Sequence, residues 1–521
     1  MRRKYYWLIY VFLALVVLGP GLDSGYLFLI DMPWPEDLHL HRYLGNGPQH
    51  QLPLSGIFTV LDWLLPAWVV QKLVLLAALA GTSTGVHSLA RRLSPSMGVA
   101  FTAGVLGMLN PFVAERLFVG QWLVIAGLGM SAWVLARLID ALRSGSRRNW
   151  IILAAGYSLL PMVSVHWWFM TTPTLLLPFL LRRFGYYKKI QVPSKRFALG
   201  SAAAFLLANS YWIVNLLRPG SKLDQISSRD FEVFQTVGDP TYGLSVNVLS
   251  LYGFWSDAAK LPKDYLPTWW IYGLGLAILG LVGLLVKCRA SKHSDQSSRA
   301  VTRSMVYCLP LIIPLALGYN SAVGGVAIDL LDSLPGFSGL RETGKSIGAL
   351  AMLVAVYAPI AAYHYARRSG LAILAILAAI HMAPLALGGF GQLKTYNYPI
   401  SWQEANAVIA DIETPVLLLP WKGYIDINFA SNTNVANPGI RYFNADLRHA
   451  SITGNPLLDR QQSSLDALVL SQYNQQWIDN VSAEGITHVL LLKTDSWSNF
   501  RGLLNDEQIV YDSLEIAVIE L

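Results

Sequence analysis

Three carboxylates lie close together near the start of the chain, and their spacing suggests proton-transfer chemistry. Asp31, Glu36 and Asp37 fall within seven residues, and two prolines stiffen the segment that holds them. Asp31 directly follows the apolar run 26–30, so we expect its side chain to be partly buried. Burial raises the proton affinity of a carboxylate, which can then act as a general base. A polar loop without catalytic function would use the same residues, and the spacing does not decide between the two.

A pair of basic residues forms a second candidate site. Arg341 and Lys345 lie four residues apart, directly before a long apolar run. If the segment is helical, both side chains share one face at the helix N-terminus, where free N–H groups and the helix dipole favour anions. This pattern predicts a phosphate-binding corner that Glu342 partly neutralises. The alternative is a structural pairing of the two cations with Glu342 or with another acid of an outward loop.

A polar turn follows the Asn110-Pro111 pair, which predicts the end of a helix. Glu115, Arg116 and Gln121 lie in or just after this turn. Either Glu115 and Arg116 form a local ion pair that anchors the turn, or Arg116 faces a cleft and binds an anion there. Glu115 and Gln121 are also candidate substrate contacts.

Aromatic residues and one histidine close a later apolar stretch, at His166-Trp167-Trp168. Tryptophan at the end of an apolar helix is typical of the aromatic belt at a membrane interface. The alternative is a sugar-stacking platform, with His166 as a hydrogen-bond partner of the substrate. His166 and Trp167 are therefore candidate substrate-binding residues.

The composition places these residues in a membrane protein. The chain has 521 residues, of which 54% are hydrophobic and 14% charged, and its mean hydropathy is +0.42. Ordinary globular proteins hold roughly 25% charged residues, so these values exclude a disordered, fibrous or wholly soluble protein. A helix that spans a bilayer needs about 20 mostly apolar residues. About eleven segments fit, near 5–20, 66–90, 97–113, 120–141, 150–168, 170–182, 196–217, 266–286, 304–319, 346–366 and 369–389.

Basic residues cluster in alternate connections between these segments, beginning with Arg2, Arg3 and Lys4. The positive-inside rule then places the N-terminus in the cytoplasm and, with an odd number of spans, the C-terminal region outside. Residues 1–389 carry a net charge of +15 and residues 390–521 carry −8, which together give the net +7. Because the positive charge is divided among short inward clusters, the basic pI of about 9.2 does not indicate nucleic-acid binding.

The sequence predicts a membrane domain at 1–389 and an extracytoplasmic α/β domain at 390–521. In the second, helix patterns at 401–412 and 461–484 alternate with strand patterns at 416–419, 487–492, 509–511 and 516–521. The chain has two cysteines, neither of them in this domain. That count excludes disulfides there, cysteine metal sites and thiol catalysis.

Several motifs, in this order along the chain, resemble a known family. They are Gly25–Met32, Asn110–Arg116 with Gly120–Trp122, Pro335–Lys345, and, in the outer domain, Leu419–Trp421, Asn437-Pro438 and Gly485–Lys493. Together they resemble the large prokaryotic membrane proteins with a glycosyltransferase C (GT-C) type fold. The resemblance covers nearly the whole chain. It implies a polytopic helical membrane protein with a small soluble α/β domain.

The resemblance implies a membrane glycosyltransferase of the cell envelope. Such enzymes take a sugar from a polyprenyl-phosphate-linked donor, and their active site opens outside the cytoplasmic membrane. Arg341, Lys345 and Arg116 would hold the lipid phosphate. The acceptor would be a glycan, a lipid or a protein, and the sugar and the stereochemical outcome are left open.

The resemblance makes Asp31 the candidate base, with Asp37 or Glu36 second. Many GT-C enzymes have a paired acidic motif directly after the first span. Here Met32 follows Asp31, and the Glu36-Asp37 pair comes five residues later, so the identity of the base is open between these carboxylates. Carboxylates also suit a divalent cation, and the sequence leaves open whether one binds.

Two other functions compete with sugar transfer. A transporter or flippase of lipid-linked sugars would need ionisable residues along a pathway through the spans and often has inverted repeats. Few charges lie deep in the spans, and no repeat is evident in the sequence. A non-catalytic scaffold would display its outer domain to a partner, and its loop carboxylates would be dispensable. The sequence has no P-loop, dinucleotide-binding or zinc motif, which disfavours a cytoplasmic nucleotide-driven machine.

Overall fold

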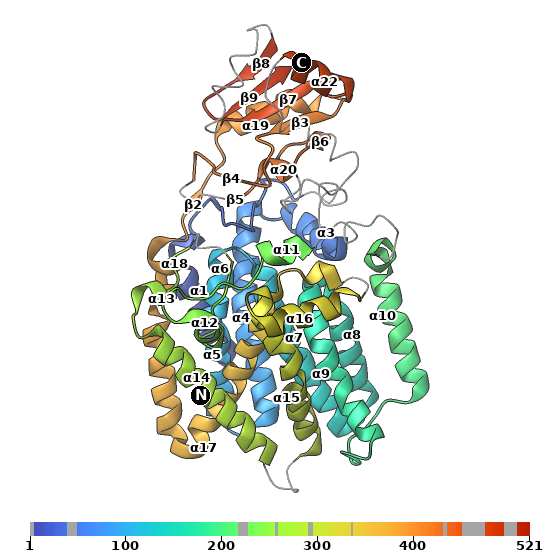
Figure 1. The fold of residues 1–521 in the computed structure, drawn as a ribbon, viewed down its shortest axis with the longest axis vertical. Helices are drawn as coiled ribbons and strands as arrows, with labels where there is room; N and C mark the ends of the chain where they lie inside the picture. Colours follow the sequence, from blue (N-terminus) through green and yellow to red (C-terminus); the bar gives the residue numbers. More distant parts are fainter. Residues whose placement is uncertain are drawn as a thin grey trace.

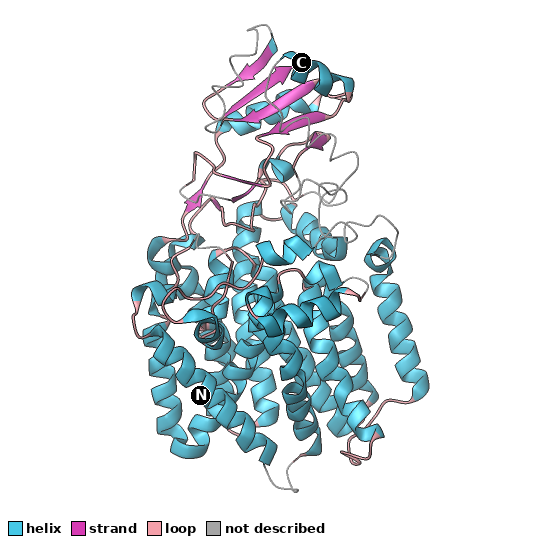
Figure 2. Ribbon diagram, in the orientation of Figure 1, coloured by secondary structure: helices cyan, strands magenta, loops and turns pink. Residues whose placement is uncertain are grey.

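The structure is a computed structural model that describes residues 5–38, 49–216, 228–255, 259–289, 295–334, 337–430, 435–450, 475–493 and 508–521. A helical bundle forms one end of the molecule and a small sheet domain the other, with short strands and loops between them (Figures 1 and 2). The predicted polytopic helical protein with a small α/β domain is confirmed. The basic cluster at 2–4 and most of the helix predicted at 461–484 lie outside the described residues.

Seven helices in the described part of the chain are long and apolar enough to cross a membrane, so this is a multi-pass membrane protein. They are α4 (Ala67–Leu93), α5 with α6 (Met97–Met108 and Pro111–Phe118), α7 (Trp122–Ser144), α10 (Lys195–Leu216), α14 (Trp269–Arg289), α15 (Gln296–Leu317) and α17 (Ile347–His381). The other predicted spans correspond to α1 (Tyr6–Leu18), α8 (Arg147–Val163) and α9 (Val165–Arg183), and to the second half of α17. Eleven spans and their orientation stay predictions.

Helix α17 contains two of the predicted spans. Arg367 leaves the helical region, with φ 53° and ψ −133°, between the predicted tenth and eleventh spans. A Cβ atom at Gly370 would lie 2.4 Å from the carbonyl oxygen of Ala362. Eight residues of continuous helix would separate these two groups by about 12 Å. The chain therefore folds back at Arg367, where the sequence places a pair of cations between two apolar runs.

The fifth and sixth predicted spans are divided at Ser164 rather than near residue 169. Helices α8 and α9 lie on either side of Ser164, whose Oγ accepts a hydrogen bond from the backbone N–H of Trp167 at 3.4 Å. Serine in extended conformation is a favourable helix N-cap. The prediction that His166 and Trp167 close a span is therefore wrong, because both lie in the first turn of α9.

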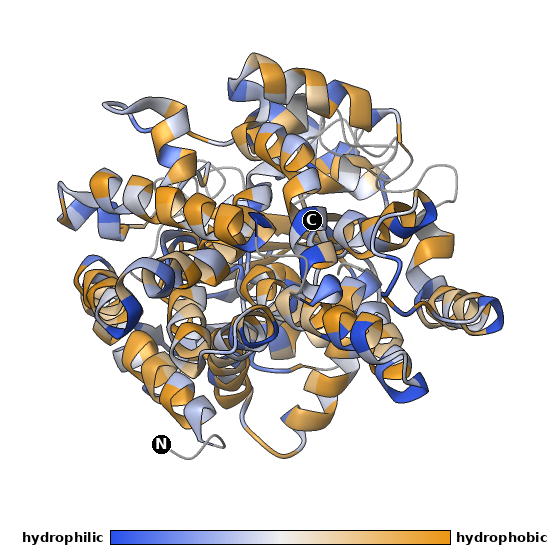
Figure 3. Ribbon diagram, turned by 90° about the horizontal axis from the view of Figure 1, so that it is seen from below, coloured by the Kyte–Doolittle hydropathy of each residue, from blue (hydrophilic) through white to orange (hydrophobic). Residues whose placement is uncertain are grey.

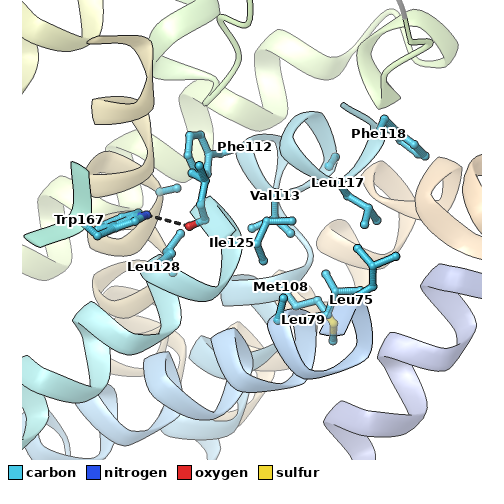
Figure 4. Close-up of a cluster of buried hydrophobic side chains, with 14 of the residues drawn as sticks. Leu75, Leu79, Met108, Phe112, Val113, Leu117, Phe118, Ile125, Leu128 and Trp167 are labelled. Atoms are coloured by element: carbon cyan, nitrogen blue, oxygen red, sulfur yellow. Dashed lines mark hydrogen bonds between the residues drawn. The ribbon is translucent and has the colours of Figure 1, made fainter. Parts of the chain in front are cut away.

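Close packing of α4 against α7 forms the centre of the bundle. A Cβ atom at Gly85 on α4 would lie 2.0 Å from the carbonyl oxygen of Gly129 on α7, so only glycine permits this approach. Buried side chains from α4 to α7 and from α9 fill the surrounding space, among them Leu79, Phe112 and Trp167 (Figure 4).

The outer sides of the helices are apolar, as expected for contact with lipid. Seen along the bundle, hydrophobic residues spread around the helices rather than being confined to inward faces (Figure 3). Helix α10 stands at the rim of the bundle (Figure 1), where Leu199 and Leu207 are 72% and 76% exposed. Exposed leucines on a long apolar helix suit contact with lipid.

The sheet domain, which runs from β2 to the C-terminus, is built on a five-stranded mixed sheet with the order β6-β3-β7-β9-β8, whose strands are labelled in Figure 1. Strand β3 (Val416–Leu419) is parallel to β6 (Leu447–Arg448) and to β7 (His488–Leu492). Strand β9 (Ile516–Glu520) is antiparallel to both β7 and β8 (Ile509–Asp512). With α19 (Ile400–Ala410) and α22 (Gln475–Ala483), these elements match the predicted α/β alternation.

Short elements lie on the part of the bundle that faces the sheet domain and in the space between the two (Figure 1). The helices among them are α3 (Leu52–Asp62), α11 (Ser228–Val233), α12 (Gly243–Leu249), α13 (Pro262–Tyr265), α16 (Ala322–Asp332), α18 (Ala386–Gly391) and α20 (Gly439–Tyr442). The strands are β1 (Tyr26–Leu27), β2 (Thr395–Tyr396), β4 (Tyr424–Ile425) and β5 (Val435–Ala436). The domain boundary predicted at residue 390 falls in α18 and stays a prediction.

Candidate functional site

Asp31 lines a cavity formed by the loops and helix ends of the bundle, to which Arg441 of the sheet domain also contributes. It follows β1, which pairs with β2, and its backbone N–H donates to the carbonyl oxygen of Val119 at 2.8 Å. The preceding residues 26–30 are buried, and Asp31 itself is half-buried, as the apolar run predicted. Its side chain lines a cavity of about 520 Å³.

Five of the residues selected from the sequence line this one cavity: Asp31, Gln121, His166, Arg341 and Lys345. They come from the first loop, the start of α7, the start of α9 and the turns that precede α17. These segments are far apart in the chain. Their convergence puts a carboxylate and two cations around a space large enough for a small ligand.

Gln121 joins two carboxylates at the cavity wall. Its Nε2 donates to Asp31 Oδ2 at 2.6 Å and to Glu342 Oε2 at 3.0 Å. Arg116 donates to Gln121 Oε1 at 2.6 Å, which fixes the amide in this orientation. The hydroxyl of Tyr424, from β4 of the sheet domain, donates to Asp31 Oδ1 at 2.8 Å. Both oxygens of Asp31 are thus held by uncharged donors.

Glu342 is the electrostatic partner of the cations. Lys345 Nζ lies 3.0 Å from Glu342 Oε1, and an Arg116 guanidinium nitrogen lies 3.7 Å from Oε2. Burial alone would raise the pKa of Glu342, but Lys345 and Arg116 outweigh burial and lower it to about 2. Glu342 is therefore ionised at neutral pH. Among the residues that line the cavity, Arg341, Lys345 and Arg441 are cations, and Asp31 and Glu342 are carboxylates.

The pKa of Asp31 is shifted upward, opposite to that of Glu342. Burial raises its pKa, and the negative charge of Glu342 raises it further, while hydrogen bonds from Gln121 and Tyr424 and the charge of Lys345 act in the other direction. The two carboxylates thus differ in their surroundings. Cations keep Glu342 ionised, whereas uncharged donors hold Asp31. Asp31 has the environment expected of a general base.

Arg341 and Lys345 do not share an α-helical face as predicted. Arg341 lies between the 3₁₀ turns Phe337–Leu340 and Thr343–Ser346, and α17 begins only after the second turn. The Arg341 guanidinium lies over the ring of Phe234, 4.9 Å from its centroid. Both cations nevertheless line the cavity, and Lys345 also makes the structural pairing with Glu342 that was the alternative.

Glu115 and Arg116 face inward and do not line the cavity. Arg116 is 1% exposed, and its guanidinium lies between the rings of Phe112 and Phe254, 5.3 and 4.8 Å from their centroids. Glu115 Oε1 accepts hydrogen bonds from the backbone N–H groups of Gly253 and Phe254. Glu115 therefore fixes the loop whose phenylalanine covers Arg116.

The remaining predicted residues lie away from the cavity wall. Trp167 is 1% exposed, and its indole N–H donates to the carbonyl oxygen of Val124 at 2.7 Å, as the dashed line in Figure 4 marks. Glu36 Oε2 accepts hydrogen bonds from Tyr442 at 2.9 Å and from Gln403 at 3.3 Å, both in the sheet domain. Asp37 follows Glu36 at this end of the loop.

Several cavity residues carried no signal in the sequence. Arg441 comes from α20 of the sheet domain, and His50 and Trp212 come from segments without a motif. Tyr424, which does not line the cavity, reaches Asp31 from β4 and carried no signal either. Burial lowers the pKa of His50 to about 4, so its imidazole is neutral. Among the described residues, no group of three or more His, Cys, Asp and Glu side chains is placed to hold a metal ion.

An apolar groove of about 390 Å³ lies between α8, α9 and α10. It is lined almost entirely by aliphatic and aromatic side chains, including Phe205 on α10. The ring of Trp168 stacks on Phe205 at 5.7 Å and meets Trp212, which lines the cavity, edge-on at 6.4 Å. Aromatic side chains thus connect the groove with the cavity.

The fold is similar to that of known membrane glycosyltransferases. No family model and no curated protein matches the sequence. The structure of the arabinofuranosyltransferase AftD from Mycobacteria matches with a TM-score of 0.61 and 16% identity, over 94% of this chain and 35% of AftD. A mutant form of AftD matches with the same TM-score and identity, over 100% of this chain and 42% of that chain. The chain therefore has a GT-C-type fold and spans about a third of the length of AftD.

Proposed function

We propose that this protein is a membrane glycosyltransferase that moves a sugar from a polyprenyl-phosphate-linked donor to an acceptor outside the cytoplasmic membrane. The observation that carries the proposal is the convergence of Asp31, Arg341 and Lys345 on one cavity. In this orientation the N-terminus is cytoplasmic and the sheet domain lies outside. The GT-C-type fold, shared with an arabinofuranosyltransferase, supports the same class of reaction.

Asp31 would act as the general base. Its half-buried carboxylate faces the cavity and has a raised pKa, so it takes the proton of an acceptor hydroxyl more readily than an exposed carboxylate would. As the hydroxyl oxygen bonds to the anomeric carbon, its proton passes to Asp31. Asp31 then returns the proton to solvent. Glu342, with its pKa near 2, is too weak a base for this role.

Arg341 and Lys345 would stabilise the leaving group. When the bond between the anomeric carbon and the phosphate oxygen breaks, the phosphate of the donor gains one negative charge. Fixed cations stabilise charge that develops at their position in the transition state. Arg116 would contribute only through Gln121 and Glu342, because its guanidinium is buried between two rings.

The apolar groove between α8, α9 and α10 would receive the polyprenyl tail. Its walls carry little polar surface and face the rim where α10 meets lipid. The aromatic contact between Phe205, Trp168 and Trp212 joins the groove to the cavity, so a tail in the groove would place its phosphate near the cations.

The test is transfer of label by the purified protein in proteoliposomes. Synthetic polyprenyl phosphates that each carry one labelled sugar, arabinofuranose among them, are offered with delipidated cell-envelope material as acceptor. We expect label to enter the acceptor fraction with the wild-type protein and to be lost in Asp31→Asn and Arg341→Ala. Wild-type transfer by both variants would overturn the assignment. Movement of the donor across the bilayer without chemical change would favour the flippase instead.

A further inference from the structure

The sheet domain contacts the chain at two points shortly before Asp31. Strand β2 pairs with β1, with Tyr396 opposite Tyr26. In addition, the backbone N–H of Ala436 in β5 donates to the carbonyl oxygen of Ile30 at 2.7 Å. Ile30 is the residue directly before Asp31. The sheet domain therefore fixes the backbone of the first loop next to its candidate base.

Tyr424 closes a circuit of short contacts around Asp31. In the β4–β5 pair, Tyr424 lies directly opposite Ala436. Ala436 holds Ile30, Ile30 is bonded to Asp31, and Asp31 Oδ1 accepts the hydrogen bond from the Tyr424 hydroxyl at 2.8 Å. The β4–β5 pair thus holds the backbone of Ile30 through Ala436 and, from the facing residue, presents the Tyr424 hydroxyl to Asp31.

The hydrogen bond from Tyr424 leaves the carboxylate able to react. Each carboxylate oxygen has two lone pairs. Tyr424 occupies one position on Oδ1 and Gln121 occupies one on Oδ2, so positions remain for an acceptor hydroxyl from the cavity. Burial and the negative charge of Asp31 raise the pKa of Tyr424, so its hydroxyl stays protonated and keeps donating.

We propose that Tyr424 is a positioning residue for Asp31, and that docking of the sheet domain through Tyr424 makes the membrane-side base ready for proton transfer. This inference rests on the proposed function, because Asp31 must be the base for its orientation to matter. The sheet domain would then be a part of the active site, in addition to any contact it makes with the acceptor.

The pH dependence of transfer provides the readout. Titratable and charged groups from several elements face the cavity or contact Asp31, namely His50, His166, Arg341, Glu342, Lys345, Tyr424 and Arg441. The hydrogen bond from Tyr424 favours the ionised form of Asp31. Removal of the hydroxyl raises the pKa of Asp31 again, so the acid limb of the rate profile moves to higher pH. The other groups are unchanged in such a variant.

The experiment compares Tyr424→Phe with Tyr442→Phe in the full-length protein, using the same labelled polyprenyl phosphates. For Tyr424→Phe we expect kcat to fall roughly tenfold and the acid limb to move up by about one pH unit, because a hydrogen bond to a charged group is lost. The KM for the donor should stay within about threefold. Tyr442→Phe also removes a sheet-domain hydroxyl, one that donates to Glu36, and should leave the acid limb in place.

The outcomes separate this inference from the proposed function. If Asp31→Asn transfers like the wild type, the base assignment fails. If Asp31→Asn is inactive while Tyr424→Phe keeps both its kcat and its acid limb, only the role of Tyr424 fails. A lower kcat with an unmoved limb and a lower melting temperature would mean a purely structural role and would also overturn it. Should Tyr424→Phe not fold, 3-fluorotyrosine at position 424 keeps the shape with a stronger donor, and the acid limb must then move to lower pH.

Discussion

The two ends of the first loop carry similar groups in different surroundings. Asp31 and Glu36 each accept a hydrogen bond from a tyrosine hydroxyl of the sheet domain, Tyr424 at 2.8 Å and Tyr442 at 2.9 Å. Asp31 faces the cavity and shares the amide of Gln121 with a second carboxylate. Glu36 instead has its further hydrogen bond from the sheet domain. The same pairing of carboxylate and phenol thus occurs once at the cavity and once at a domain interface.

This difference shows that residue type and a phenol partner do not by themselves make a base. Asp31 is distinguished by burial and by the negative charge of Glu342, which together raise its pKa. Glu342 can stay ionised beside Asp31 because Lys345 and Arg116 hold it in that form. The cavity end of the loop therefore combines a carboxylate of raised proton affinity with cations. We therefore expect substitutions at the cavity end of the loop to affect transfer and those at its outer end to affect stability.

The largest effect is expected at Asp31. Asp31→Asn keeps the size of the side chain but removes the proton acceptor, so kcat for label transfer should fall by about 10² to 10⁴. The measurement is the initial rate in proteoliposomes at fixed, saturating donor. A melting temperature near that of the wild type serves as the control for folding. A loss below about threefold would remove the distinction between the two ends of the loop.

Much of the cavity end could be predicted from the sequence, because the membrane restricts where polar residues can lie. Asp31 and Lys345 stand where apolar runs end or begin, which places them at the interface without any knowledge of tertiary contacts. Gln121 and Arg341 also stand close to apolar runs, so the same reasoning predicts their position at the interface. The prediction of a helical face for Arg341 failed because the chain forms 3₁₀ turns before α17.

The positions of the other site residues depend on packing between segments that are far apart in the chain. Arg116 could face a cleft or the core, and the outcome was set by Phe254, which covers its guanidinium from a loop about 140 residues away. Tyr424 reaches Asp31 only because β4 pairs with β5 and β5 contacts the first loop. No spacing within either segment encodes these contacts.

A smaller effect is expected for substitution of Arg341, which tests only the cavity end of the comparison. Arg341→Ala removes a charge-assisted contact with the donor phosphate that strengthens as the phosphate gains charge, so kcat/KM for the donor should fall roughly 10- to 100-fold. Arg341→Lys, which keeps the charge but loses the planar fork, should recover part of the loss. The assay varies the concentration of the polyprenyl-phosphate donor. An unchanged kcat/KM in Arg341→Ala would move the phosphate away from this cation.

Glu342→Gln should move the acid limb in the direction opposite to Tyr424→Phe. Without the negative charge of Glu342, the pKa of Asp31 falls, and Asp31 stays ionised at lower pH. The acid limb of kcat should therefore move down, by about one pH unit. The profile is measured in a constant-ionic-strength buffer, because charge effects depend on salt. A limb that stays in place would mean that Asp31 is not the group that titrates.

The smallest effect is expected at the outer end of the loop. Glu36→Gln removes a charge that contacts only the sheet domain among the hydrogen bonds described, so transfer should stay within about threefold of the wild type. The substitution should instead lower the free energy of unfolding, by about 0.5–1.5 kcal/mol for each hydrogen bond that is weakened. A double-mutant cycle of Glu36→Gln with Tyr442→Phe, read by thermal unfolding, should give a coupling energy of this size. If the cycle instead shows coupling in kcat, both ends of the loop take part in the reaction, and Glu36 becomes a second candidate for the base.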